Sequence, residues 1–533
     1  MNNKSALWLF VALFAVLMSI PWLVPHTGWL VLVGFLPLLL ADDLADHIGV
    51  KRFWIWHYSA FVLWNAFTTF WVGGATVGGA VFAILANALQ MSVIWGIFRF
   101  SKKRLDGALP YMFLAVMWIA WEKAYFGFQI SWPWLVLGNA FARTTHLVQW
   151  YSVTGSLGGS LWVWAVNLGL FGLLSALAEG RWNLWNKVAR GASAAAMALV
   201  IIVPIACSLI MYHSYDERSE GKLDVLIGQP NFDPYEKFKS MSQADQNDVL
   251  LELYENAIDE DTDLLLAPET FTSDICLDNP GGSPTLRAFS DFLYNHPNTS
   301  MLMGASTYNV YLQHSAPSIL ARPYGDSAWL ESHNSAIMLT AGGMQDVYQK
   351  SKLVVGTELT PFPKLFVPLD KWLSKKMGVS GLMGRCIGQD EASVLNAGGV
   401  PVGCAVCYES VYGEYCTEFV KAGAKLMTVI TNDAWWGNMP GYKQHMSYSR
   451  LRAIELRRDI ARCGNTGISA IIDQKGDVVE ETPWWERTTL KGEVNLNSEE
   501  SFFVRNGDIP GRICILAFLL LAALLLVRCF VKK

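Results

Sequence analysis

The sequence predicts an α/β domain inserted in an all-α membrane bundle of about eight transmembrane helices. Two observations predict this fold class. Of the 533 residues, 52% are hydrophobic and only 16% are charged, against roughly 25% charged residues in an ordinary soluble protein. The apolar residues are also concentrated towards the two ends of the chain, whereas the middle has the composition of a soluble domain. We therefore divide the chain into 1–215, 216–508 and 509–533.

Eight apolar segments are candidates for membrane spans, each of which needs about 20 residues. Seven precede the α/β region and one follows it: 6–24, 28–41, 53–72, 76–98, 108–127, 157–178, 192–212 and 510–530. The second is short, and the fifth contains Glu122 and Lys123. The apolar stretch 132–142 is also short and contains Pro133, so we expect a re-entrant or interfacial segment there. The first segment is too long for a usual signal peptide and no cleavage site follows it, so we expect an uncleaved helix.

Lysine and arginine residues predict the orientation of these helices. They gather after the second, fourth, sixth and eighth segments, at 51–52, 99–104, 181–190 and 528–533, with Arg143 as the main exception. Loops rich in these residues stay in the cytoplasm. Both termini are thus predicted to be cytoplasmic, with 216–508 on the other side. The net charge of −5 and the lack of a clustered basic face argue against nucleic-acid binding.

Within 216–508, short apolar runs alternate with helical stretches, which is typical of an α/β sheet covered on both faces. The expected helices are 243–259, 285–295, one beginning near Tyr412, and 443–458. The expected strands are 223–228, 264–267, 301–304, 335–340, 347–352, 402–406, 425–431 and 467–472, with a hairpin across Gly342 and Gly343. In such sheets, catalytic and binding residues usually lie at the carboxyl ends of the strands. Three reactive residues lie at such ends: Glu269, Lys350 and Cys407.

Cys407 closes an apolar strand just before a predicted helix. The field of a helix N-terminus favours the thiolate, which would suit a nucleophile. The alternative is a buried structural cysteine, the commoner fate of a cysteine in a strand. Cys404 points to the opposite face of the strand, so we assign it to the core rather than to a redox pair. The nine cysteines show no zinc-like spacing and specify no disulfide, and we expect neither a metal nor a cofactor.

Glu269 directly follows an apolar strand, where partial desolvation favours a general base. The alternative is a turn or capping carboxylate. In a strand, Lys350 and Lys352 lie on the same face, so the alternation pattern does not show which of the two would be the functional lysine. The alternative is that both are solvated surface lysines. An ammonium beside the thiol would stabilise an oxyanion. His445, which follows Trp435-Trp-Gly437, is an alternative, papain-like base for Cys407.

The order of these three residues resembles that of the nitrilase superfamily. The motifs are Leu-Ala-Pro-Glu269-Thr, Tyr-Gln-Lys350-Ser-Lys-Leu-Val-Val-Gly-Thr-Glu358 and Ala-Val-Cys407-Tyr-Glu-Ser. Together with Thr431-Asn-Asp-Ala-Trp-Trp-Gly437, with Arg450-Leu-Arg-Ala-Ile-Glu-Leu-Arg457 and with the membrane helices, they resemble the apolipoprotein N-acyltransferase branch over essentially the whole chain.

The resemblance implies a nitrilase-like αββα sandwich and assigns the lysine to Lys350. It also implies supporting roles for Glu358, which would orient Lys350, and for Tyr408 and Glu409, which would shape the nucleophile turn. The sequence departs from the family's Leu-Val-Pro-Phe-Gly-Glu at Leu353-Val-Val-Gly-Thr-Glu358, and the stretch 229–235 is not followed by the tryptophan that some members have. These departures concern the loops through which lipid would enter.

The implied activity is acyl transfer in two steps. A membrane phospholipid would donate a fatty acyl chain to Cys407 as a thioester, with Glu269 as base and Lys350 at the oxyanion. The N-terminal amine of diacylglyceryl-cysteine in an apolipoprotein would then accept the chain. The resemblance implies an integral protein of the bacterial cytoplasmic (inner) membrane with its catalytic domain on the periplasmic side, and we expect a monomer.

Two other classes of protein remain open. One is a membrane-tethered amidase or nitrilase-type hydrolase that uses the same three residues but has no need of eight helices. The other is a transporter or channel. If the protein were one, paired charged residues would be expected within the helices. Glu122 and Lys123 are the only obvious candidates for such a pair.

Overall fold

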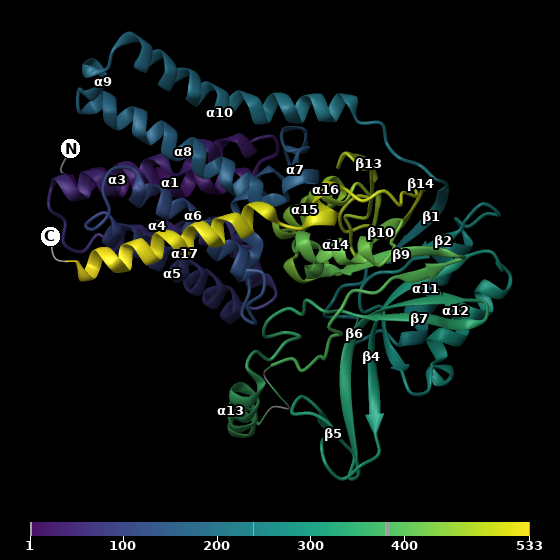
Figure 1. Ribbon diagram of the computed structural model, residues 1–533. Coiled ribbons are helices and arrows are strands. Elements are labelled where there is room, and N and C mark those ends of the chain that lie inside the picture. Colours follow the sequence, from purple (N-terminus) through teal and green to yellow (C-terminus); the bar gives the residue numbers. More distant parts are fainter. Residues whose placement is uncertain (1–2, 238, 379–380, 382, 532–533) are drawn as a thin grey trace.

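The computed structural model describes residues 3–237, 239–378, 381 and 383–531, so residues 1–2 and 532–533 of the predicted terminal segments lie outside it. Helices gather at one end of the molecule and two β-sheets at the other (Figure 1). The chain leaves the helical bundle at the end of α10 (Lys187–Ser214) and returns to it through α16 (Phe502–Asn506) and α17 (Ile509–Phe530). Both termini lie at the end of the bundle that is far from the sheets.

Six helical segments among the described residues are long and apolar enough to cross a membrane. These are Lys4–Leu23, Gly28–His47, Val77–Ser101, Ser156–Ala178, Lys187–Ser214 and Ile509–Phe530. The other two predicted spans form α4 (Trp54–Thr69) and α6 (Leu109–Tyr125), which have 16 and 17 residues. Both pack within the bundle, α4 against α1 (Asn3–Leu23) and α5 (Val77–Ser101), and α6 against α5 and α17. The count of eight spans therefore stays a prediction.

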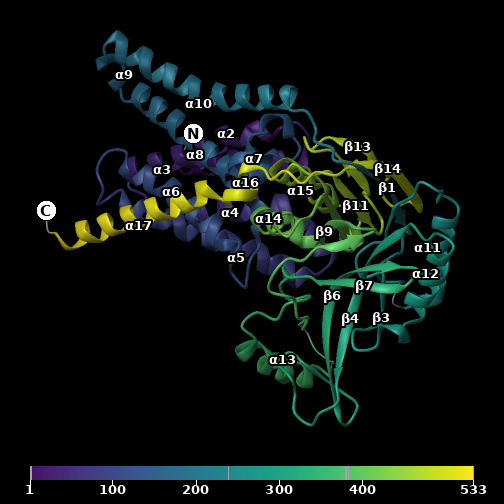
Figure 2. The ribbon, with the colours of Figure 1, turned by 45° about the vertical axis from the view of Figure 1, so that its right-hand side comes forward.

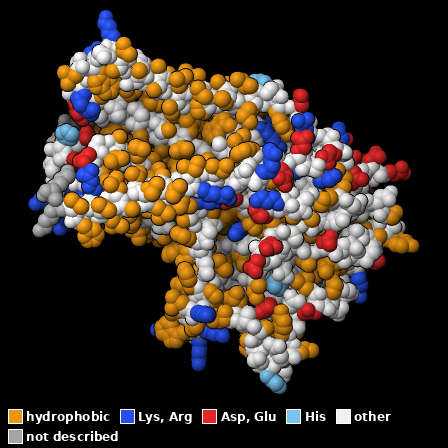
Figure 3. All heavy atoms as spheres, viewed as in Figure 1, with side chains coloured by type: hydrophobic (Ala, Val, Ile, Leu, Met, Phe, Trp, Pro, Cys, Tyr) orange, Lys and Arg blue, Asp and Glu red, His pale blue; other side chains and the backbone are white. Residues whose placement is uncertain are grey.

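An aromatic core fills the bundle. The ring of Phe35 lies at its centre, 4.3–6.4 Å from the ring centroids of four buried tryptophans: Trp64, Trp95, Trp118 and Trp164. Such ring pairs add to the energy of area burial alone. The outer surface of the bundle is covered by apolar side chains (Figure 3), which is the surface expected of helices that face lipid. The stretch 132–142 forms two buried turns, η3 (Pro133–Leu135) and η4 (Leu137–Phe141), and not a long helix.

The part of the chain between α10 and α16 contains two mixed sheets. In the described residues, the first has the order β14-β1-β2-β4-β6-β5, with β3 beside β4 and β7 beside β6; the second has the order β13-β12-β11-β10-β9-β8. The strands of the first sheet are β1 (Lys222–Gln229), β2 (Leu264–Leu266), β3 (Thr272–Cys276), β4 (Ser300–Tyr311), β5 (Arg322–Tyr324), β6 (Ala328–Thr340), β7 (Gly343–Gln349) and β14 (Thr488–Asn495). Those of the second are β8 (Leu395–Ala397), β9 (Val400–Val406), β10 (Leu426–Thr431), β11 (Ile460–Gly464), β12 (Ala470–Ile472) and β13 (Val478–Glu481).

The two sheets pack face to face around a shared apolar core. The outer face of the first sheet is covered by α11 (Gln243–Glu255) and α12 (Pro284–Tyr294). The outer face of the second is covered by α14 (Gly413–Lys421) and α15 (Gly441–Leu456), and α15 also contacts the bundle. Figures 1 and 2 show this order of layers from the bundle outwards. The predicted fold class, an αββα sandwich attached to a helical bundle, is confirmed.

The strand pattern in the sequence suggested one sheet, and the structure has two. A strand inside this sandwich is buried on both sides, by the other sheet and by helices, so its sequence is apolar throughout and does not reveal which sheet it joins. The predicted hairpin is confirmed as β6 and β7. The expected strand at 467–472 begins only at Ala470. The strands β3, β5, β8, β11, β13 and β14 and the helix α13 (Pro363–Met377) were not predicted.

Candidate active site

Cys407 lies at the end of β9 in a turn with an unusual backbone. Its φ is +52°, in the left-handed region that costs an L-residue about 1–2 kcal/mol. The residue begins a short 3-10 turn, η7 (Cys407–Val411), and α14 starts only at Gly413. The helix predicted to begin near Tyr412 thus begins at Gly413, and five residues separate its first residue from Cys407.

The surroundings of Cys407 disfavour the ionised form of its thiol. Burial raises its pKa well above its usual value, and the nearby carboxylate of Glu269 raises it further, while Lys350 opposes the rise. The cost of desolvating a negative sulfur thus exceeds the help from the ammonium of Lys350. A thiol in this state needs a base before it attacks a carbonyl carbon.

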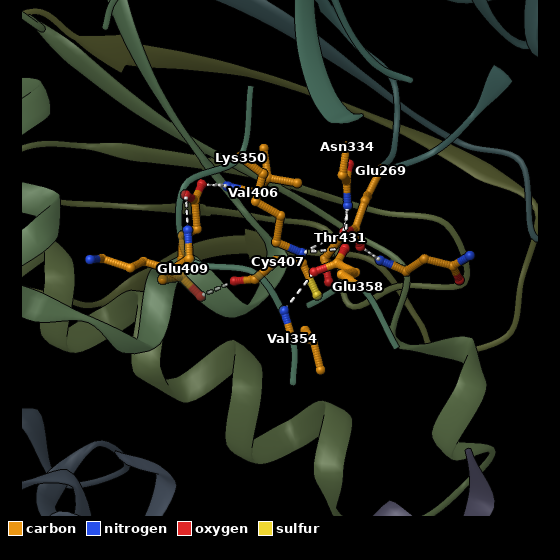
Figure 4. A network of polar contacts seen from close by, with 12 residues as sticks. Glu269, Asn334, Lys350, Val354, Glu358, Val406, Cys407, Glu409 and Thr431 are labelled. Carbon is orange, nitrogen blue, oxygen red and sulfur yellow. Dashed lines mark hydrogen bonds and ion pairs between the residues drawn. The ribbon is translucent and has the colours of Figure 1, made fainter. Parts of the chain in front are cut away.

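Glu269 and Lys350 form a buried ion pair. Lys350 Nζ lies 3.0 Å from Glu269 Oε1 and 3.0 Å from Glu358 Oε1 (Figure 4). Burial alone would lower the pKa of Lys350, but the carboxylates of Glu269 and Glu358 outweigh it and hold the pKa well above its usual value. Lys352, which strand alternation left open as an alternative, lies over the ring of Tyr415 at 4.8 Å and outside this pair.

Asn334 joins the two carboxylates, and sequence reasoning missed it. From β6, its Nδ2 donates to Glu269 Oε1 at 2.8 Å and to Glu358 Oε1 at 2.6 Å. The second oxygen of Glu269 accepts from the backbone N–H of Asn432 at 3.2 Å. Asn334 immediately precedes the predicted strand 335–340 and belongs to no motif, so nothing in the sequence distinguished it from a strand-edge asparagine.

Glu409 fixes the separation between the lysine and the cysteine. Its Oε1 accepts from the backbone N–H of Ser351 at 2.7 Å and of Lys352 at 3.0 Å, and its Oε2 accepts from the N–H of Val406 at 2.9 Å. One buried carboxylate thus ties the chain after Lys350 to the strand before Cys407. Glu358 is held by the N–H of Val354, which donates to its Oε2 at 2.7 Å.

His445 lies beside Cys407 but does not contact the sulfur by a hydrogen bond. Its Nε2 is 3.1 Å from the main-chain oxygen of Cys407 and 3.0 Å from Ser410 Oγ, and its Nδ1 is 2.8 Å from Asp433 Oδ1. Asp433 also accepts from Arg462 at 2.6 Å. Although burial alone raises the pKa of Asp433, His445 and Arg462 lower it below its usual value.

These contacts also bear on metal binding. The ligand atoms of Cys407, Asp433 and His445 lie within 4.8 Å of one another, a spacing that a metal ion requires. However, Asp433 is already paired with Arg462, and both ring nitrogens of His445 have partners. A cation there would compete with a buried guanidinium, so the cluster fits a hydrogen-bond network that holds the turn better than it fits a metal site.

The nucleophile turn rests directly on the helical bundle. The hydroxyl of Tyr408 donates to the main-chain oxygen of Ser131 at 3.1 Å, and its ring is stacked near Trp132. The hydroxyl of Tyr412 lies 2.7 Å from Ser131 Oγ. The residues that follow Cys407 in the chain are therefore packed against the stretch expected to be re-entrant or interfacial.

The charged residues of α6 do not form the pair that a transporter would need. Glu122 accepts from the N–H of Leu137 at 2.9 Å and from Trp118 Nε1 at 3.2 Å. Lys123 instead forms ion pairs with Glu414 and Asp508 outside the bundle. Lys123 thus ties the bundle to the sandwich, and the two residues that the sequence offered for a transporter pair are not paired with each other.

Comparisons with known proteins agree with this architecture. Residues 226–502 match the carbon-nitrogen hydrolase family, and residues 14–169 match the apolipoprotein N-acyltransferase N-terminal domain. The chain is 28% identical to an apolipoprotein N-acyltransferase of Chlorobaculum tepidum, over 93% of this chain and 91% of that protein. It is 26% identical to one of Geobacter metallireducens, over 97% and 95%. A structural alignment with Saccharomyces cerevisiae Nit3, a nitrilase-superfamily protein, includes 53% of this chain and 93% of the Nit3 chain. The identity is 14% and the TM-score is 0.36.

Proposed function

The chain belongs to the carbon-nitrogen hydrolase family, and from this premise we propose that it is an N-acyltransferase that moves a fatty acyl chain from a membrane phospholipid to the N-terminal amine of diacylglyceryl-cysteine in apolipoproteins. One observation carries the proposal: the turn that bears Cys407 is packed on the membrane bundle through Tyr408 and Tyr412. A hydrolase of small soluble amides would not need its nucleophile at a bilayer surface.

The first half-reaction forms a thioester. Glu269 takes the proton from Cys407 Sγ, and the sulfur attacks an ester carbonyl carbon of the phospholipid. Lys350 and a main-chain N–H of the Cys407 turn stabilise the negative oxygen of the tetrahedral intermediate, each such donor being worth about 3–4 kcal/mol. The C–O bond then breaks, the lysophospholipid leaves with the proton that Glu269 returns, and the acyl group stays on sulfur.

The second half-reaction releases the acyl group to the lipoprotein. Glu269 takes a proton from the incoming amine, whose nitrogen attacks the thioester carbonyl. The C–S bond breaks, the amide forms, and the proton returns to Cys407. Because one carboxylate serves both steps, its contacts with Lys350 and Asn334 have to hold it within reach of the sulfur throughout the cycle.

Three further parts of the proposal concern placement. We assign 1–215 and 509–533 to the bacterial inner membrane and 216–508 to its periplasmic side, as a monomer. The basic residues after alternate segments support this orientation, and so does the position of both termini at the end of the bundle away from the sheets. The orientation puts Cys407 on the side where lipoproteins are displayed.

The decisive experiment is intact mass measurement of the purified full-length protein after incubation with a phospholipid of known acyl chains. We expect a mass increase of one acyl group, lost on addition of a diacylglyceryl-cysteine peptide with appearance of the triacylated peptide. Cys407→Ala should show no increase, and Cys404→Ala is the matched control that should. Acylation by a small amide with none by phospholipid would identify a hydrolase instead.

A further inference from the structure

A cavity lies where the bundle meets the catalytic domain, and none of the residues that line it belongs to the site around Cys407. Its volume is about 300 Å³. Nine residues line it: His26, Arg143, Thr145, His146, Leu209, Tyr212, His213, Arg450 and Asp477. The mechanism above uses none of them, although together they include three of the nine histidines of the chain.

The lining residues come from both parts of the molecule. His26 lies in the turn after α1, and 143–146 precede α7 (Tyr151–Thr154), while 209–213 form the last turns of α10. The catalytic domain contributes Arg450 from α15 and Asp477 from the turn between β12 and β13. The end of α10 that lines the cavity is the end nearest the sheets (Figure 1), so the cavity lies where the apolar bundle meets the sandwich, which we take as the membrane boundary. Figure 3 shows basic side chains along this boundary, where the apolar surface of the bundle ends.

The cavity lining holds more basic groups than acidic ones. Two guanidinium groups share one lining carboxylate, Asp477, which accepts from the hydroxyl of Tyr212 and lies 3.6 Å from Arg450 Nη2, and three imidazoles offer further hydrogen-bond donors. Outside the lining, Asp473 and Glu481 also act on Arg450 but not on Arg143. Arg143 donates to the main-chain oxygen of Leu23 at 3.0 Å and forms no ion pair with any residue that the structure describes. Burial lowers the pKa of Arg143, and Arg450 lowers it further. An anion in the cavity would relieve this repulsion.

The arginine from the catalytic domain is held in place before any ligand binds. Arg450 Nε donates to the main-chain oxygen of Gly476 at 2.6 Å, and its Nη2 donates to Thr145 Oγ1 at 2.9 Å. These bonds fix the plane of the guanidinium at the wall of the cavity. A fixed guanidinium plane is well suited to the oxygens of a phosphate group, which it binds with directed, charge-assisted hydrogen bonds.

We propose that this cavity binds the phosphate of a net-anionic phospholipid from the adjacent leaflet, at a site distinct from that of the acyl donor. Arg143 and Arg450 bind the phosphate oxygens, and His26, His146 and His213 surround them. The acyl chains lie along α10, which presents apolar side chains such as Ile202, Val203 and Ile210 to its surroundings. Location at the membrane boundary favours a lipid over a free phosphate ion as the source.

Such a lipid would join the bundle to the helix that supports the nucleophile. Arg450 and His445 both belong to α15, five residues apart, which is roughly 7.5 Å along a helix axis. His445 holds the main-chain oxygen of Cys407. A ligand that contacts Arg143 on one side and Arg450 on the other therefore stabilises the contact between the two parts of the protein, whether or not acyl transfer takes place.

The test measures thermal unfolding of the full-length protein in a neutral detergent, so its result is independent of turnover. The probes are ether-linked phosphatidylglycerol, which has no ester to transfer, ether-linked phosphatidylcholine and inorganic phosphate. We expect phosphatidylglycerol to raise Tm by at least about 2 °C. Phosphatidylcholine and inorganic phosphate at equal concentration should raise it much less. An equal effect of inorganic phosphate would overturn the assignment to lipid, and an equal effect of phosphatidylcholine would overturn the anionic preference.

Variants then locate the binding. Arg143→Gln should weaken the apparent affinity for phosphatidylglycerol at least about tenfold, because it removes a charge-assisted contact. His26→Gln and His146→Gln should weaken it less and in an additive way, because neither side chain forms a hydrogen bond or ion pair with any residue that the structure describes. Arg287→Gln and His314→Gln, at exposed positions of the catalytic domain, are the matched controls. Unchanged affinity in Arg143→Gln and in the double histidine variant would place the lipid elsewhere and refute the proposal.

Discussion

The imidazole of His445 contacts the main-chain oxygen of Cys407, at 3.1 Å, and not its sulfur. The histidine is itself held by Asp433, which is held by Arg462. A chain of three buried side chains thus supports the one turn whose backbone is strained, while the proton of the thiol is left to a carboxylate on the other sheet. We infer that His445 is a positioning residue, and Glu269 the base.

Replacement of His445 tests this division. We expect His445→Gln to retain about 1–10% of the single-turnover rate of acylation, because loss of one hydrogen bond to the turn costs about 1–3 kcal/mol. The dependence of the rate on pH should keep its shape. A loss as large as that of Glu269→Gln, together with a rate that rises steeply with pH, would instead make His445 the base.

Glu269→Gln should slow both half-reactions by about 10²–10⁴. The raised pKa of Cys407 gives the sign of the pH effect: below that pKa the thiolate fraction rises about tenfold per pH unit, so the variant should form more thioester as pH rises. Transfer of the thioester to the peptide should stay slow. The measurement is single-turnover: acylate with phospholipid, follow the adduct by mass, then add diacylglyceryl peptide. Discharge at the wild-type rate would show that another group serves the second step.

Lys350 and Lys352 provide a matched pair two residues apart. Lys350→Ala leaves two buried carboxylates without their cation and removes an oxyanion donor, so we expect no measurable acylation. Lys352→Ala loses a contact with the ring of Tyr415 and should keep most of the activity. Intact mass after incubation with phospholipid separates the two, with membrane extraction and Tm to check folding. The reverse result would mean that the wrong lysine has been assigned.

Asn334→Ala removes the amide group that donates one hydrogen bond to Glu269 and one to Glu358. We expect kcat to fall at least about tenfold, since hydrogen bonds to charged groups are worth about 1.5–3 kcal/mol each, while KM for phospholipid changes little. Asn295→Ala, at an exposed position, is the control. A rise in KM with unchanged kcat would show that Asn334 contacts the substrate rather than the carboxylates.

Much of the molecule was predictable because it follows strong local patterns. The apolar segments in the first 215 residues and the strand ends at Glu269 and Cys407 were read from runs of apolar residues, and each run is long or sharply bounded. The choice of Lys350 over Lys352 came from the family resemblance, because strand alternation treats the two alike. The structure distinguishes them by burial: one ammonium lies between two carboxylates and the other lies over an aromatic ring.

The parts that were not predicted depend on contacts between distant segments. Asn334 acts on Glu269 from a strand 65 residues away, and no local pattern encodes that meeting. From its place before a helix, the thiol of Cys407 was expected to be in a field that favours the thiolate. Burial among residues of two sheets and the carboxylate of Glu269 instead raise its pKa, and a local pattern does not encode those contacts. The residues that line the cavity between the bundle and the catalytic domain are likewise far apart in the sequence, from position 26 to position 477.

The pairing of β1 with β14 has a mechanical consequence. The strand that follows α10 and the strand that leads back to α17 lie side by side, from Lys222 opposite Asn495 to Gln229 opposite Thr488. The catalytic domain is therefore joined to the bundle by two chain segments that both leave from the same edge of the first sheet, the edge formed by β14 and β1. A force that separates α10 from α17 would act on Lys222 and Asn495, which are paired, and would open the ladder from that end one hydrogen bond after another, while the opposite edge of the sheet, at β5, would carry no load from the chain.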